Sequence, residues 1–147
     1  CQQHAYILKK GEVEVPGFLA DAFTQGNRLQ DIFTANFKQG RTGNEILLSS
    51  LEAAKVEGLR PAIYTHPLGV YGHSSGTTLG MWDSQDSVPV TGDYPLHYNT
   101  VYAIELNTTV NIPQWNKDIR IMLEEAGFFG ENGFRYVNSR QKTIKGI

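Results

Sequence analysis

Apolar residues recur at helical spacing in the first third of the chain. Between Pro16 and Phe37 two apolar clusters follow the i, i+3, i+4 pattern, which predicts a helix over this range. The dipeptide Gly26-Asn27 separates the clusters and predicts a break or bend there. A second helix is expected from Thr42 to Gly58. Thr42 and Glu45 have the spacing of a capping box, and Gly58 is a typical C-terminal stop.

The remaining residues have the pattern of strands and loops. Residues 74–99 are rich in loop-forming types. β-branched and aromatic residues predict strands over 100–110, 118–129 and 134–137, with shorter strands over 3–8 and 62–65. No repeat or linker divides the chain. The pattern therefore predicts one α+β domain, with two helices packed on an antiparallel sheet.

The two long strands each carry a carboxylate opposite an aliphatic face. Side chains alternate along a strand, so Glu105 lies on the face away from Tyr102, Ile104 and Leu106. Glu124 likewise shares a face with Arg120 and Met122, whereas Glu125 points to the helix-covered side. A glutamate in such apolar sequence is costly to bury unless it is paired or binds a cation. An ion pair with Arg120 is one interpretation of Glu105, and adjacent acids such as Glu124 and Glu125 are often simply solvated.

The segment THPLGVYGH places His66 and His73 on either side of two glycines. A neutral imidazole binds divalent transition metals, and carboxylates complete the coordination of harder ions such as manganese. His66 with Glu105 and Glu124 is therefore a reasonable ligand set. The alternative is that His66 caps a turn and His73 is exposed. His4 and His97 have no acidic neighbour in sequence that suggests a role. In the loop that follows, Met81, Trp82 and Tyr94 either shape a substrate pocket or anchor the loop.

Composition excludes several classes of function. The chain has 147 residues, a net charge of −2 and a pI near 6.1, which is not the basic footprint of a nucleic-acid-binding protein. No apolar run approaches the roughly 20 residues needed to cross a membrane. Cys1 is the single cysteine, so no internal disulfide forms. The chain begins without methionine, and we expect it to be a piece cut from a longer, cytoplasmic protein.

Three elements together resemble a known family. They are the H-x6-H segment from His66 to His73, the strand VYAIE ending at Glu105, and RIMLEE with Glu124. This order resembles the pita-bread metallopeptidases, with the closest likeness to the Xaa-Pro branch of aminopeptidase P and prolidase. The stretch KQGRTGNEIL is similar to the turn that precedes the first histidine in that family. The likeness spans nearly the whole chain. It implies a partial pita-bread (creatinase/aminopeptidase-like) fold, in which residues 1–147 form the C-terminal portion of the catalytic domain.

The resemblance also implies roles for individual residues. The sheet would be curved and antiparallel, with the two helices on its convex face. His66, Glu105 and Glu124 would be metal ligands, one glutamate bridging two divalent ions. Manganese is expected, with cobalt or zinc as alternatives. His73 would face the substrate and stabilise the tetrahedral intermediate. The implied reaction is attack of a metal-activated water on the peptide bond before proline, which releases the N-terminal residue of an Xaa-Pro peptide.

The sequence departs from the family pattern at several positions. The family needs two aspartate ligands, which would lie upstream of Cys1 and are absent from this chain. Ala62 stands where the family often has histidine, and Met122 where arginine is frequent. We therefore expect the isolated chain to be inactive and to bind metal weakly. The peptide substrate is the expected partner, and a homodimer remains open. The alternative function is a non-catalytic pita-bread domain that binds a peptide or protein, but the presence of both histidines and both glutamates favours the enzyme.

Overall fold

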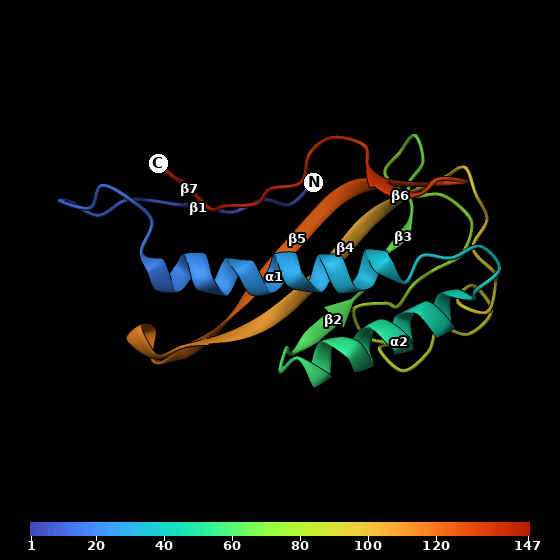
Figure 1. Ribbon diagram of the computed structural model, residues 1–147, viewed down its shortest axis with the longest axis horizontal. Helices are drawn as coiled ribbons and strands as arrows, with labels where there is room; N and C mark the ends of the chain where they lie inside the picture. Colours follow the sequence, from blue (N-terminus) through green and yellow to red (C-terminus); the bar gives the residue numbers. More distant parts are fainter.

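Two helices lie in the first half of the chain, α1 at Gly17–Ala35 and α2 at Gly43–Val56 (Figure 1). The computed structural model describes residues 1–147. The predicted break at Gly26-Asn27 is wrong, because α1 is continuous through both residues. Gly26 serves close packing instead, since a Cβ atom there would lie 2.6 Å from Ile121 Cγ2 of the sheet. Neither helix has the length and apolar character that crossing a membrane requires.

The capping box predicted at the start of α2 is present. Glu45 N donates to Thr42 Oγ1 at 3.1 Å, and Thr42 N donates to Glu45 Oε2 at 2.8 Å. This reciprocal pair satisfies two N–H groups that the start of a helix leaves without partners. It explains why α2 begins at Gly43, directly after Thr42.

The main sheet is antiparallel, with the strand order β2-β4-β5-β6. These strands are β2 (Pro61–Ile63), β4 (Thr100–Ile112), β5 (Lys117–Gly130) and β6 (Gly133–Tyr136), and the short β3 (His66–Pro67) also pairs with β4. A 3-10 turn at Pro113–Trp115 and the left-handed Asn116 (φ 48°) connect β4 to β5. This tight connection sets the register of the two long strands.

The two helices cover one face of the sheet (Figure 1). The aliphatic faces predicted for the long strands point into this layer, which confirms the alternation argument. The core contains Tyr102, Ile104, Leu106, Ile121 and Leu123 from the sheet, packed against helix residues that include Phe23, Leu29, Phe33, Ile46 and Leu47. We call the opposite surface of β4 and β5 the second face; it carries Glu105, Asn107, Arg120, Met122 and Glu124.

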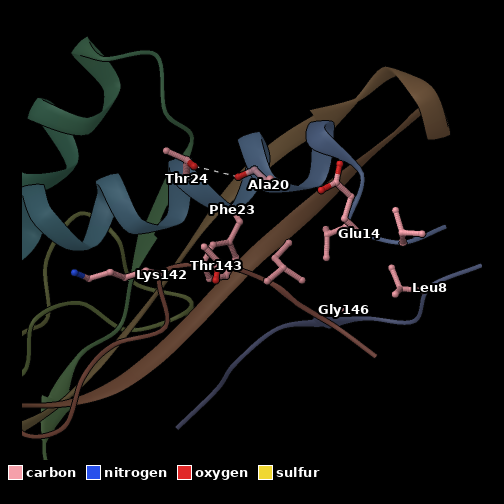
Figure 2. A pocket seen from close by; sticks show the side chains of 11 residues that line it. Leu8, Glu14, Ala20, Phe23, Thr24, Lys142, Thr143 and Gly146 are labelled. Atoms are coloured by element: carbon pink, nitrogen blue, oxygen red, sulfur yellow. Dashed lines mark hydrogen bonds between the residues drawn. The ribbon is translucent and has the colours of Figure 1, made fainter.

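The N-terminal and C-terminal segments of the chain run side by side (Figure 1). β1 (Ala5–Tyr6) and β7 (Lys145–Gly146) form a separate parallel pair, so the predicted strand over 3–8 is shorter than expected. A groove of about 450 Å3 lies between this pair and the start of α1 (Figure 2). Leu8, Phe23 and Thr143 are among its lining residues, and none of the predicted site residues is.

The loop over residues 74–99 is held against the sheet and α2 by long-range hydrogen bonds. Thr65 and Leu79 exchange two backbone hydrogen bonds, of 3.1 Å and 2.8 Å. The Gln85 side chain accepts from Ile63 N at 2.9 Å and donates to Ile63 O at 2.8 Å. Leu96 N donates to Arg41 O at 2.8 Å, just before α2. These bonds position the loop beside β2 and β3.

Candidate metal site

His66 lies next to Glu105 on the second face. It begins β3, whose pairing places it opposite Ala103 of β4. His66 Nε2 lies 3.2 Å from Glu105 Oε2, and His66 Nδ1 lies 3.0 Å from the carbonyl oxygen of Pro67. A carbonyl oxygen only accepts hydrogen bonds, so Nδ1 must carry the proton that it donates. The same contact therefore directs Nε2 toward the carboxylate, an arrangement often found for metal-binding histidines.

The backbone of Glu105 is fixed by hydrogen bonds to the neighbouring residues Thr65 and Tyr64. Thr65, which is fully buried, accepts from Glu105 N at 3.0 Å and donates to Glu105 O at 3.1 Å through its hydroxyl. Tyr64 N donates to the same carbonyl oxygen at 3.0 Å. The alternative pairing of Glu105 with Arg120 is not formed, and the nitrogen that contacts the carboxylate is Nε2 of His66.

Glu124 lies directly opposite Glu105 in the β4–β5 register. Like charges that face each other across two strands are unfavourable unless a cation compensates them. Glu124 Oε1 lies 3.5 Å from the backbone nitrogen of Cys1, because Gln2 pairs with Glu124 through the backbone. Glu125 is buried on the helix side and accepts from Gln141 N at 3.1 Å, as the alternation predicted.

A tight turn stacks His73 on His66. The ring centroids are 4.2 Å apart and the rings are nearly parallel, at 9°. Gly72 N donates to Gly69 O at 3.0 Å, and Ser74 N donates to the carbonyl oxygen of Pro67 at 3.0 Å. Gly72 has a φ of 87°, a conformation that favours glycine. His73 is exposed, so its ring is open to solvent beside the ring of His66.

The donor set fits part of a metal coordination shell. Nε2 of His66 and the carboxylate of Glu105 both offer electron pairs at 3.2 Å. Two ligands of one ion with bonds of about 2.1 Å lie about 3.0 to 3.4 Å apart. Nitrogen and carboxylate oxygen are ligands that suit manganese, cobalt or zinc. No group of three or more His, Cys, Asp or Glu side chains is arranged to hold a metal ion. Glu124 lies opposite Glu105 in the sheet, but its carboxylate does not form a three-ligand group with His66 and Glu105.

The other histidines lie elsewhere. His4 Nε2 is 2.7 Å from the carbonyl of Met122, and its ring packs edge-on against Phe23 at 5.7 Å between centroids. These contacts tie the N-terminal segment to β5 and α1. His97 is exposed in the long loop.

Tyr64 and Thr65 were not predicted as site residues. Burial raises the pKa of the Tyr64 hydroxyl, a hydrogen bond with Asn107 lowers it, and the charges of Glu105 and Glu124 raise it again. Tyr64 thus lies within the field of both carboxylates. The sequence contained a usable signal, because Ala62, Tyr64 and His66 alternate along the chain and share a face. Of the loop aromatics, Trp82 lines a cavity with Tyr64 and Met122, whereas Tyr94 does not.

The sequence matches no protein-family model and no curated protein. Solved structures are similar over 91% of this chain. They include an X-Pro aminopeptidase from Thermotoga maritima (TM-score 0.66, 18% identity), a dipeptidase from Pyrococcus horikoshii (0.61, 16%) and an Xaa-Pro dipeptidase from Bacillus anthracis (0.59, 17%).

The chain spans about a third of the length of these structures, 35%, 34% and 34% respectively. At this level of identity the likeness shows the fold. It confirms the predicted partial pita-bread fold, and it supports the resemblance to the pita-bread peptidases.

Proposed function

We propose that the chain is the C-terminal portion of the catalytic domain of a metal-dependent peptidase that acts on Xaa-Pro peptides. One observation carries the proposal: Nε2 of His66 lies 3.2 Å from Glu105, and Glu124 faces Glu105 from the next strand. The fold in which this arrangement occurs is that of an X-Pro aminopeptidase and an Xaa-Pro dipeptidase.

In this proposal His66, Glu105 and Glu124 hold two divalent ions, manganese being the expected metal. The ions, when bound, supply a Lewis acid that activates water and polarises the peptide carbonyl. The negative charge of the two facing glutamates favours cation binding, and the Nδ1 bond to Pro67 keeps the His66 lone pair directed at the site. The remaining ligands, two aspartates, would come from residues that precede Cys1. Gln2 pairs with Glu124, so such residues would enter beside that carboxylate.

His73 has a separate role in the proposal. Its ring lies over that of His66 and is exposed, so it is accessible to a substrate without displacing a ligand. We assign it the hydrogen bond to the substrate carbonyl oxygen as negative charge develops there. Removing one such donor typically lowers kcat by about a hundredfold to a thousandfold.

The test uses the full-length protein that contains this chain, loaded with manganese, and assays release of the first residue of an Xaa-Pro peptide. We expect His66→Ala to lose bound metal and activity together. His73→Ala should keep the metal while kcat falls by about a hundredfold or more. The exposed His97 is the matched control, and His97→Ala should retain both properties.

Two outcomes would contradict the proposal. Unchanged metal content in the His66→Ala variant would show that His66 is not a metal ligand. A protein with its metal sites filled that cleaves no Xaa-Pro peptide would instead favour a binding domain.

A further inference from the structure

A cavity of about 470 Å3 opens on the second face, beyond the pair of carboxylates. Its walls come from four parts of the chain: β2 and the residues beside it, the long loop, β4 and β5. The side chains that matter for its chemistry are Arg60, Tyr64, Trp82, Arg120 and Met122. Neither Glu105 nor Glu124 lines it.

The cavity is continuous with the candidate metal site along the strands. From the Glu105–Glu124 pair, the next pair on the same face is Asn107–Met122, and the one after is Thr109–Arg120. All four residues of these two pairs line the cavity. Arg120 is four residues from Glu124, which corresponds to about 13 Å at about 3.3 Å per residue. An extended peptide of three to four residues spans the same length.

The two arginines of the cavity differ in their charge balance. Arg60 Nη1 lies 2.6 Å from Asp118 Oδ2, and this contact, with a further hydrogen bond from Asn111, lowers the pKa of Asp118 to about 2. Arg60 is therefore neutralised within the chain. Arg120 takes part in none of the ion pairs of the chain and in none of its side-chain hydrogen bonds. Its guanidinium is exposed at the cavity, with five donors and no acceptor.

Aromatic and apolar side chains form the rest of the lining. Trp82 is 78% exposed although it is the largest side chain in the cavity. A tryptophan that leaves most of its surface in water is available to pack on a ligand. Ala62 and Met122 contribute apolar wall without a competing charge. An unpaired guanidinium beside an exposed indole suits an anionic group carried on an organic chain.

We propose that this cavity binds a carboxylate of the peptide substrate, on the side that follows the cleaved bond, and that Arg120 determines this specificity. The inference rests on the proposed function for the direction of the peptide. The peptide lies along β4 and β5, with its cleaved bond at the carboxylate pair and its acidic group at Arg120. The carboxylate is either the C-terminus of a short peptide or an acidic side chain, and both present the same planar group to the guanidinium.

The binding test uses product-side peptides, which are not cleaved, and the metal-loaded full-length protein in a calorimeter. The first pair compares Pro-Ala-Glu amide with Pro-Ala-Gln amide. The second pair compares two forms of Pro-Ala-Ala, one with a free C-terminal carboxylate and one with a C-terminal amide. We expect the acidic member of at least one pair to bind about tenfold tighter. The pair that shows the preference identifies the source of the carboxylate.

Variants locate the preference. Arg120→Gln should reduce the affinity ratio of acidic to neutral peptide to about one, and Arg120→Lys should leave an intermediate ratio because lysine lacks the planar fork. Arg135 is exposed on β6 and outside the cavity. Arg135→Gln removes the same charge and should retain the tenfold ratio. Equal affinity for acidic and neutral peptides, or an equal loss in Arg135→Gln, overturns the inference.

The catalytic arm separates this inference from the proposed function. The same product-side peptides, each extended by an N-terminal alanine (Ala-Pro-Ala-Glu amide and its counterparts), serve as substrates, and kcat/KM is compared. Cleavage without any preference for acidic peptides refutes the carboxylate site and leaves the peptidase standing. Absence of cleavage with a preserved, Arg120-dependent binding preference refutes the peptidase and leaves the carboxylate site.

Discussion

Charged residues on the second face differ in whether the chain itself supplies their counter-charge. Arg60 is paired with Asp118, whereas Glu105 contacts Nε2 of His66, which offers a lone pair rather than a charge. Glu124 forms no ion pair with an arginine or lysine side chain, and neither does Arg120 form one with an acid. The residues left with unbalanced charge are thus two acids at the candidate metal site and one base at the cavity. Exposed ion pairs contribute little to stability, so this division bears mainly on what the face binds.

The Arg60–Asp118 pair gives a prediction for pH. In Arg60→Gln the pKa of Asp118 should rise from about 2 toward its ordinary value, because the guanidinium is the main cause of the lowering. A carboxyl with a lowered pKa in the folded state stabilises the fold above its unfolded pKa of about 3.9. That contribution is lost as the pH falls through about 2. Carbon NMR of the Asp118 carboxyl measures the shift directly.

The hydrogen bond from Asn111 keeps part of the lowering in the Arg60→Gln variant. The control is Arg135→Gln, which changes the same charge on β6 and should leave the Asp118 titration in place. A wild-type Asp118 that titrates near 4 would contradict the prediction, as would identical titration curves in wild type and Arg60→Gln.

At the scale of elements, α1 and β5 meet at a glycine. The sequence pattern predicted a break at Gly26, because glycine between two apolar clusters commonly interrupts a helix. In the structure the absence of a side chain at Gly26 allows α1 to pack closely against β5, since a Cβ there would lie 2.6 Å from Ile121 Cγ2 and 3.0 Å from Leu123 Cδ1. The sequence pattern alone does not distinguish a glycine that interrupts a helix from one that allows close packing. The distinction depends on the distance between a helix and a sheet that are about 95 residues apart in the chain.

Replacement of Gly26 tests this packing role. Gly26→Ala should lower the free energy of unfolding by about 1 to 3 kcal/mol, since overpacking outweighs the gain of about 1 kcal/mol in helix propensity. Gly17 of the same helix is the matched control, because a Cβ there meets nothing within 4 Å. Gly17→Ala should be neutral or slightly stabilising. Urea denaturation measures both, and equal effects of the two substitutions would show that packing against β5 does not determine the choice of glycine.

At the scale of the whole molecule, the sequence predicted the layers better than the site. Alternation along 100–110 and 118–129 indicated which face each glutamate occupies, and the register places Glu105 opposite Glu124. The approach of His66 to Glu105 depends on β3 pairing with β4 across more than 30 intervening residues. The cavity likewise requires Trp82 of the long loop to reach β5. Such long-range pairings leave no local pattern, and the parallel β1–β7 pair has none either.

The last prediction concerns the folding and the metal affinity of residues 1–147 as an isolated chain. Its core cluster lies entirely within residues 22–123 together with Phe129, so we expect the isolated chain to fold and to show a cooperative thermal transition. The proposed metal site, however, draws only His66, Glu105 and Glu124 from this chain, and these three side chains are not arranged as a complete ligand group. We expect it to bind manganese about a hundredfold more weakly than the full-length protein, because affinity depends on the number of charged ligands.

Calorimetric titration of both proteins with manganese, paired with the Xaa-Pro peptide assay, tests this expectation. The isolated chain should release no N-terminal residue. In the full-length protein Glu124→Gln should weaken metal binding, whereas the exposed Glu131, in the turn between β5 and β6, is the matched control. Glu131→Gln should bind metal as wild type does. Equal metal affinity in the isolated chain and the full-length protein would show that residues 1–147 already contain the complete coordination shell, and that no upstream aspartates are needed.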